Sequence, residues 1–428
     1  MAQGRDDAAT MRRRALTDER VTWRDRAFPD RDVPLTEVGA QGWHLLDGDF
    51  HLPVVALRET AIERNLALMR DYCTRHDVLI APHAKTTMSP ALVQRQLATG
   101  AWGITVANVQ QAKVFITAGV RRVLVANPVV GPADLAYLAA LRRADPDLEV
   151  LLLVDSVEAV ALLVDRVSPD AADLRPQPVL VELGYAGGRG GVRSTDDALR
   201  IAQAVRDADG VELVGIEGFE GLVPGADLVE RRDRAADFLD WSATVVRELI
   251  DRRLLPGSGA VVSFGGSSYF DLVVARFREL WSGDRVEVML RSGCYLTHDH
   301  GLYARTSPFV GHDPAPLPAL EVWAEVLSRP EPALAILGAG RRDVSTDADL
   351  PLPVAVRRDG HTRPVDDLRV TAVNDQHAMV AVSEEASLEV GDLVCLGVSH
   401  PCTTFDKWRL VPVVTDKYEV IDAVRTYF

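Results

Sequence analysis

The sequence predicts an α/β protein with a (β/α)8 barrel in its N-terminal part and an antiparallel β domain at its C-terminal end. From about residue 52 to 290, short apolar runs alternate with amphipathic stretches, at a period of about 25–30 residues. After residue 300, proline-rich turns separate short runs of strand-forming residues. We therefore expect an N-terminal extension at 1–45, the barrel at 46–300 and the β domain at 301–428.

Eight apolar runs are assigned to the barrel strands: Leu52–Leu57, Val78–Ala81, Trp102–Val106, Arg122–Ala126, Leu148–Val154, Pro178–Leu183, Val211–Glu217 and Ala260–Phe264. The helix-like stretches include Thr60–Arg75, Ser89–Ala98, Asn108–Ala118, Ser156–Val167 and Asp227–Asp251. A doubly wound open sheet would show the same alternation, and the count of eight decides for the barrel. A ninth run, Val286–Leu290, is then expected to leave the barrel.

The strand candidates of the β domain are Val322–Leu327, Leu368–Val373, Ala378–Ser383, Leu393–Gly397 and Arg409–Val414. The extension at 1–45 packs either on this domain or on a partner subunit. Its run of three arginines, at 12–14, is interpreted as a solvated helix face.

Composition excludes several classes of protein. With 47 basic and 62 acidic residues the net charge is −15, which argues against a general nucleic-acid or anionic-membrane surface. No apolar run reaches the roughly 18 residues of a membrane helix, and the N-terminus lacks the apolar core of a signal peptide. Four cysteines are too few for a disulfide scaffold in 428 residues. We expect a cytoplasmic protein with reduced thiols.

Lys85 is the first candidate for chemistry. The apolar run Val78–Ala81 leads directly into Pro82-His83-Ala84-Lys85, in which His83 and Lys85 alternate with small residues. A lysine at the carboxyl end of a barrel strand points into the barrel mouth, where desolvation lowers its pKa and makes it a nucleophile toward an aldehyde. The alternative is a surface lysine at the start of a loop.

A glycine-rich loop follows the eighth strand candidate and contains Gly265, Gly266 and Ser267. Glycines let the backbone approach an anion, and exposed N–H groups and serine hydroxyls bind phosphate oxygens. In barrels the loops after the last two strands are the usual phosphate site. A plain tight turn is the alternative.

Two further loops are candidates for ligand binding. Arg189 is presented by the glycine-rich stretch at 184–191, where it contacts either a cofactor ring or a substrate carboxylate, or is simply solvated. Gly293 and Tyr295 follow the ninth run and would complete a phosphate cup.

A metal site is predicted at His400-Pro401-Cys402, because imidazole and thiolate ligands suit a soft metal ion. The alternative for Cys402 is a buried structural cysteine. His298 and His300 are interpreted as solvated loop residues. His377 lies in a loop of the same domain and would contact the substrate or support a ligand.

Together these motifs resemble the family of D-serine dehydratase and D-threonine aldolase, which are alanine racemase-like (fold type III) pyridoxal phosphate (PLP) enzymes. The resemblance runs from about Leu52 to Leu410. It implies that Lys85 carries PLP and that His400 and Cys402 bind Zn2+. A cysteine at the second ligand position resembles the dehydratases, whereas the aldolases typically carry aspartate there.

Two positions depart from the family pattern. Ala81 and Thr87 stand where the family often has arginine and histidine, respectively. These departures favour a broader amino acid deaminase over a strict D-serine enzyme.

The resemblance implies a homodimeric lyase acting on a small D-amino acid, with Lys85 as its catalytic lysine. His83 and His377, chosen for their positions in the sequence, are the further candidate catalytic residues. The expected reaction is PLP- and zinc-dependent conversion of a D-β-hydroxy amino acid, such as D-serine, to a 2-oxo acid and ammonia. The alternatives are metal-dependent retro-aldol cleavage to glycine and an aldehyde, and a non-enzymatic PLP-binding protein. A racemase would need a second base, which the sequence does not identify.

Overall fold

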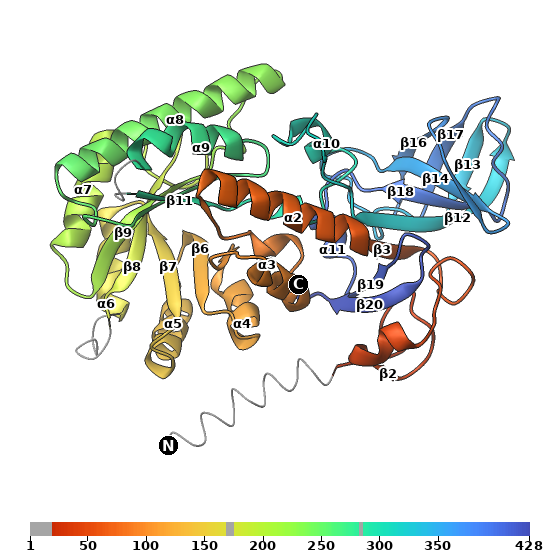
Figure 1. The fold of residues 1–428 in the computed structure, drawn as a ribbon, viewed down its shortest axis with the longest axis horizontal. Coiled ribbons are helices and arrows are strands. Elements are labelled where there is room, and N and C mark those ends of the chain that lie inside the picture. Colours follow the sequence, from red (N-terminus) through yellow and green to blue (C-terminus); the bar gives the residue numbers. More distant parts are fainter. Residues whose placement is uncertain (1–18, 168–174, 282–285) are drawn as a thin grey trace. The chain divides into compact units, whose positions relative to one another are not determined.

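The computed structural model describes residues 19–167, 175–281 and 286–428 (Figure 1). The chain divides into two compact units. The first contains Met1–Met69, Thr86–Arg95 and Cys294–Phe428, and the second contains Arg70–Lys85 and Gln96–Gly293. The arginine run at 12–14 lies outside the described residues.

The second unit is built on an eight-stranded parallel sheet in the order β4-β11-β10-β9-β8-β7-β6-β5. Its strands are β4 (Leu79–Ile80), β5 (Ile104–Val106), β6 (Arg122–Pro128), β7 (Glu149–Val154), β8 (Gln177–Leu183), β9 (Val211–Gly218), β10 (Ala260–Phe264) and β11 (Val286–Leu290). The end strands are joined by a parallel bridge between His83 and Thr105, and the Thr105 N–H donates to the Pro82 carbonyl at 2.9 Å. The predicted barrel is confirmed, and it is nearly closed.

Two strand assignments were wrong. Val286–Leu290 is a barrel strand, paired in parallel with β10 and β4. The first predicted run instead forms β3 (Val54–Arg58), which pairs antiparallel with β12 and parallel with β19 in the first unit. Val54–Leu57 are all buried, so the run looks the same whether it lies in a barrel or in the centre of another sheet.

The helices are α2 (Glu59–His76), α3 (Pro90–Ala98), α4 (Val109–Thr117), α5 (Pro132–Ala144), α6 (Val157–Val167), α7 (Thr195–Arg206), α8 (Leu228–Asp251) and α9 (Phe270–Trp281). In the second unit α7, α8 and α9 cover the outside of the strands (Figure 1, green). Side chains of Asn108, Ser194 and Asp227 accept backbone N–H groups at the starts of α4, α7 and α8, which fixes where those helices begin. Apolar side chains such as Leu151 and Met289 fill the core between the strands.

The first unit contains the predicted antiparallel β domain, in the order β15-β14-β18-β12-β13-β17-β16. Its strands are β12 (Leu320–Glu331), β13 (Leu334–Leu337), β14 (Leu352–Arg358), β15 (His361–Pro364), β16 (Leu368–Val373), β17 (Ala378–Val382), β18 (Leu393–Gly397), β19 (Leu410–Val414) and β20 (Val420–Arg425). Short helical turns in this unit are η4 (Cys294–Leu296), α10 (Leu302–Thr306) and α11 (Cys402–Phe405).

The described part of the N-terminal extension packs on the last strands of the same unit. It contains β1 (Arg20–Val21), β2 (Val33–Pro34) and η1 (Leu35–Ala40). Arg425 of β20 forms ion pairs with Glu19 at 2.5 Å and Asp25 at 2.7 Å. Two packing partners were predicted for the extension, the β domain and a partner subunit. The described residues pack on the β domain. Within the described ranges, no helix combines the length and apolarity needed to cross a bilayer.

Candidate functional site

Lys85 lies in the short turn η2 (Ala84–Thr86), directly after the first barrel strand. The segment continues alongside β11 beyond the end of β4, since the Ala81 N–H donates to the Leu290 carbonyl at 2.8 Å and the His83 N–H to the Arg291 carbonyl at 3.1 Å. Lys85 is half-buried. The chain thus carries this amine to the carboxyl end of the barrel, where (β/α)8 enzymes build their active sites.

His83 precedes Lys85 in the same segment. Its Nδ1 is buried and has no hydrogen-bond partner among the described residues. Burial, and then the charges of Lys85, Arg291 and Arg189, hold the pKa of His83 well below its usual value. The imidazole is therefore neutral near pH 7.

Buried charged side chains gather at the carboxyl ends of β8, β9 and β11. Arg291 forms an ion pair with Glu217 and donates to the Gly218 carbonyl at 2.6 Å. Burial, together with the charges of Glu217 and Asp155, raises the pKa of Glu182 to about 8. Burial also raises the pKa of Glu217. These residues were missed, although a glutamate inside an otherwise apolar run such as Val-Leu-Val-Glu-Leu is a visible signal.

The glycine loop after β10 binds an anionic group of the protein itself. The N–H groups of Gly265 and Gly266 donate to the Glu220 carboxylate at 3.2 and 2.6 Å. The Ser292 hydroxyl donates to the Gly266 carbonyl at 3.1 Å. Two successive backbone N–H groups around a carboxylate form a nest with the chemistry that a phosphate requires. Ser267 follows them, half-buried.

Gly293 has a structural reason to be glycine, because a Cβ there would lie 2.4 Å from the His83 carbonyl oxygen. Tyr295 is buried in η4 of the first unit. Arg189 is exposed, and its guanidinium lies 5.0 Å from the centre of the Phe219 ring.

A thiol and imidazole cluster lies in the first unit. The ligand atoms of Cys294, His400 and Cys402 all lie within 4.8 Å of one another, and the two Sγ atoms are 3.5 Å apart. His400 Nδ1 lies 2.7 Å from the Asp347 carboxylate, which also accepts the Thr403 hydroxyl at 2.7 Å. The structure therefore brings together the two predicted ligands and adds Cys294. No local spacing connects Cys294 to a motif more than a hundred residues away.

The other candidate histidines are not part of this cluster. His298 is buried and His300 is half-buried, so their interpretation as solvated residues was wrong. Burial lowers the pKa of each to about 4, which keeps both rings neutral. His377 lies exposed in the turn between β16 and β17, and its role stays a prediction.

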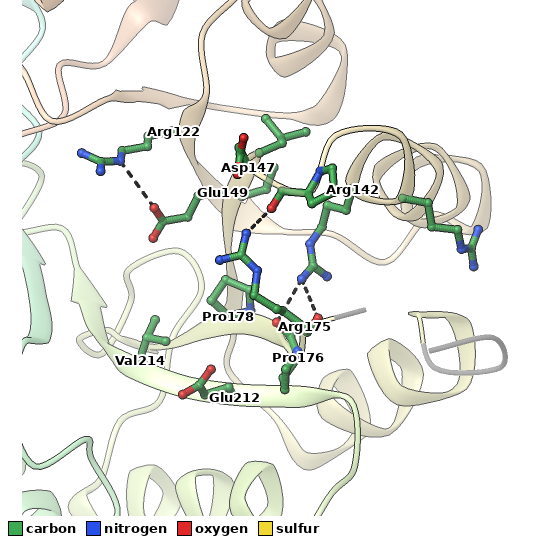
Figure 2. Close-up of a pocket in the computed structure, with 13 residues that line it drawn as sticks. Arg122, Arg142, Asp147, Glu149, Arg175, Pro176, Pro178, Glu212 and Val214 are labelled. Atoms are coloured by element: carbon green, nitrogen blue, oxygen red, sulfur yellow. Dashed lines mark hydrogen bonds and ion pairs between the residues drawn. The ribbon is translucent and has the colours of Figure 1, made fainter. Parts of the chain in front are cut away.

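A cavity of roughly 1000 Å3 opens at the other end of the barrel, near the first residues of β6, β7, β8 and β9 (Figure 2). Several arginines line it, but some of their guanidinium groups already contact carboxylates or carbonyl groups of the protein. Arg122 lies 3.6 Å from Glu149, and Arg142 donates to the carbonyls of Arg175 and Pro176 at 2.8 and 3.0 Å. These contacts hold loop and strand ends together and lie opposite the end that carries Lys85.

Comparison with known proteins gives the family. The profile "Alanine racemase, N-terminal domain" matches residues 57–273, and "Putative serine dehydratase domain" matches residues 319–414. The chain is 31% identical to D-threonine aldolase from an Arthrobacter species over 370 residues, 85% of this chain and 89% of the relative. The chain belongs to the fold type III family of PLP enzymes.

Aldolases and dehydratases both occur among its relatives in this family. D-threonine aldolase from Filomicrobium marinum superposes with a TM-score of 0.72 at 27% identity, over 88% of this chain and 95% of that one. D-threo-3-hydroxyaspartate dehydratase from a Delftia species is 32% identical over 152 residues, 35% of this chain and 38% of the relative. A metal-free variant of a D-threo-3-hydroxyaspartate dehydratase superposes with a TM-score of 0.68 at 22% identity, over 88% of this chain and 97% of that one.

Proposed function

We propose that this protein is a PLP- and zinc-dependent lyase that removes the β-hydroxyl group of a D-β-hydroxy amino acid, such as D-serine. The products would be ammonia and a 2-oxo acid, which is pyruvate for D-serine. The observation that carries the proposal is the thiol and imidazole cluster. Thr86, the residue directly after Lys85, has its hydroxyl 3.5 Å from both Cys294 Sγ and Cys402 Sγ. The residue that follows the predicted cofactor lysine in the sequence therefore contacts two predicted or candidate metal ligands.

The barrel residues fit PLP. Lys85 would hold the aldehyde, and the nest at Gly265 and Gly266 has the donors for a phosphate once Glu220 releases them. Buried polar atoms of Ser263, Glu182 and Glu217 have no hydrogen-bond partner among the described residues. Such orphaned atoms at the carboxyl end of a barrel are expected where a polar ligand binds.

Side chains of this protein would carry out the proton transfers. When bound, PLP supplies an electron sink for the α-carbanion, and zinc polarises the β-hydroxyl group. Lys85 would take the α-proton as general base. His83 is neutral and so can accept a hydrogen bond beside it. Glu182 keeps its proton up to about pH 8 and therefore can act as a hydrogen-bond donor near neutral pH.

The soft ligand set supports elimination over aldol cleavage. Solved structures of D-threo-3-hydroxyaspartate dehydratase include variants in which a histidine and a cysteine, two positions apart, were each replaced by alanine, the cysteine variant in metal-free form. His400 and Cys402 have the same spacing. The second candidate, retro-aldol cleavage to glycine and an aldehyde, is favoured by the 31% identity to D-threonine aldolase over most of the chain.

Product analysis tests the proposal. The purified protein, loaded with PLP and Zn2+, is incubated with D-serine, D-threo-3-hydroxyaspartate and D-threonine, and ammonia, 2-oxo acid, glycine and aldehyde are measured. We expect ammonia and 2-oxo acid in equal amounts. Glycine and aldehyde without ammonia would establish the aldolase instead, and a coloured protein that forms none of these products would favour a non-enzymatic PLP-binding protein.

Two variants separate the proposed roles. Lys85→Ala should lose turnover together with the visible absorbance of bound PLP. Cys402→Ala should keep that absorbance and lose elimination, because the metal and not the cofactor depends on the thiol. Loss of PLP from the cysteine variant would contradict this division. A homodimer in the cytoplasm remains our expectation, and sedimentation of the loaded protein tests its oligomeric state.

A further inference from the structure

We propose that Cys294 is a third protein ligand of the metal ion, which would then be held by two thiolates and one imidazole with a fourth position open to substrate. This inference rests on the proposed metal dependence and deepens it. It assigns a role to a buried thiol that the sequence motif His400-Pro401-Cys402 does not include.

The distances fit one tetrahedral ion. Two sulfur ligands bound to zinc at about 2.3 Å each lie about 3.8 Å apart. The Sγ atoms of Cys294 and Cys402 are 3.5 Å apart, and the ligand atom of His400 lies within 4.8 Å of both. A disulfide would need an S–S distance of about 2.0 Å. The pair is therefore spaced for a shared ion and not for a covalent bond.

The imidazole of His400 is oriented toward the thiols. Its Nδ1 is occupied by the Asp347 carboxylate at 2.7 Å, so Nε2 is the nitrogen that faces Cys294, to which the ring is hydrogen-bonded. A metal-binding histidine typically gives its second nitrogen to a carboxylate in this way, which fixes the ring. Thr403 in turn holds the second Asp347 oxygen at 2.7 Å.

The surroundings of Cys294 favour a thiolate ligand over an inert buried thiol. Its Sγ lies 3.5 Å from the Thr86 hydroxyl and is also hydrogen-bonded to Tyr303. Both hydroxyl groups can donate to a sulfur anion. By contrast, Cys395, another buried thiol of the same unit, lies on β18 outside the ligand cluster.

The third ligand has a chemical consequence. Two thiolates and a neutral imidazole form a soft donor set, which favours Zn2+ over Mg2+ or Mn2+. Three protein ligands with one open position are also the arrangement of catalytic zinc sites, in which the open position takes water or a substrate oxygen. A site with only His400 and Cys402 would bind zinc more weakly and discriminate less between metals.

Metal binding tests the inference without relying on turnover. The variants Cys294→Ser and, as matched control, Cys395→Ser are compared with the wild type for zinc affinity against a competing chelator, and for the sulfur-to-metal absorption of the Co2+-loaded protein. We expect roughly tenfold or greater loss of affinity for Cys294→Ser. We also expect its Co2+ absorption to fall to about half, as one of two thiolates is lost, with the control unchanged.

A second measurement uses the wild type and does not depend on the folding of any variant. Zinc should protect both Cys294 and Cys402 from alkylation, as read by mass spectrometry with and without a chelator. If the wild type binds zinc but Cys294 is alkylated equally in both conditions, or is found in a disulfide with Cys402 in the loaded protein, this inference fails and the metal dependence stands. If the wild type binds no metal, both fail.

Discussion

Asp347 would support the proposed metal site, although its carboxylate is not one of the proposed ligands. Burial would raise its pKa, but hydrogen bonds from Thr403 and His400 outweigh that effect and lower it, so the carboxylate is charged at neutral pH. A charged acceptor on Nδ1 fixes the ring of His400 and makes Nε2 a stronger donor to a metal. We therefore expect Asp347 to act as a positioning residue for His400.

Replacing this carboxylate should weaken metal binding. We expect Asp347→Asn to lower zinc affinity by roughly 10- to 100-fold while PLP binding is retained. Asp349→Asn is the matched control, because Asp349 pairs with Arg305 at 2.6 Å and its carboxylate lies outside the ligand cluster. Chelator competition gives the affinity. Equal affinities for Asp347→Asn and the wild type would show that His400 needs no such support.

The candidate site residues that the sequence could single out are those that share one short segment. Lys85 and His83 lie shortly after an apolar run in the sequence, and His400 and Cys402 lie two positions apart. Cys294 escaped prediction because only folding brings it to the pair. The Glu217–Arg291 ion pair escaped for the same reason, since its members lie on β9 and just after β11.

At the level of elements, close contact between barrel strands limits which side chains fit at single positions. Gly215 of β9 pairs with Val261 of β10, and a Cβ at Gly215 would lie 1.8 Å from the Val261 carbonyl oxygen. This obstacle is backbone within a sheet, so it cannot rotate away as a side chain would. The register between β8 and β9 also shifts next to Gly215.

A methyl group at this position should therefore destabilise the barrel. We expect Gly215→Ala to lower the free energy of unfolding by about 1–3 kcal/mol or more, the range for overpacking a well-packed site. Gly257→Ala is the control, because a Cβ there meets nothing within 4 Å. Urea denaturation of both variants measures the difference. Equal urea midpoints for the two variants would mean that β9 and β10 move apart to fit the methyl group at no cost in stability.

The predicted number of barrel strands was right, but one run was wrongly included in the barrel and another was wrongly left out. Periodicity shows how many buried runs the chain has, and eight of them do form the barrel. It does not show which neighbour each run will pair with. β3 and β11 are both short and largely buried, so only the long-range pairing of β3 with β12 and of β11 with β4 distinguishes them.

At the scale of the whole molecule, the buried carboxyl groups of the barrel make stability depend on pH. The net charge of −15 already makes the protein self-repelling at neutral pH. Burial raises the pKa values of Glu182, Glu217 and Glu220 above the ordinary value of 4.5, and that of Glu182 reaches about 8. The sequence shows the charge total but not that these three glutamates are desolvated together.

The sign of this effect follows from proton binding. Between about pH 4.5 and 8, the folded protein keeps a proton on Glu182 that the unfolded chain has released. The stability that this proton provides is fully present below pH 4.5 and is lost as the pH rises through 8, at no more than about 1.4 kcal/mol per pH unit. Glu182→Gln carries no such proton, so its stability relative to the wild type should increase steadily from pH 5 to 8.

Glu212→Gln, which removes an exposed carboxylate of β9, controls for the change in net charge. Thermal unfolding of the three proteins across this range measures the difference, and parallel curves for Glu182→Gln and the wild type would show that Glu182 is ionised in the folded protein.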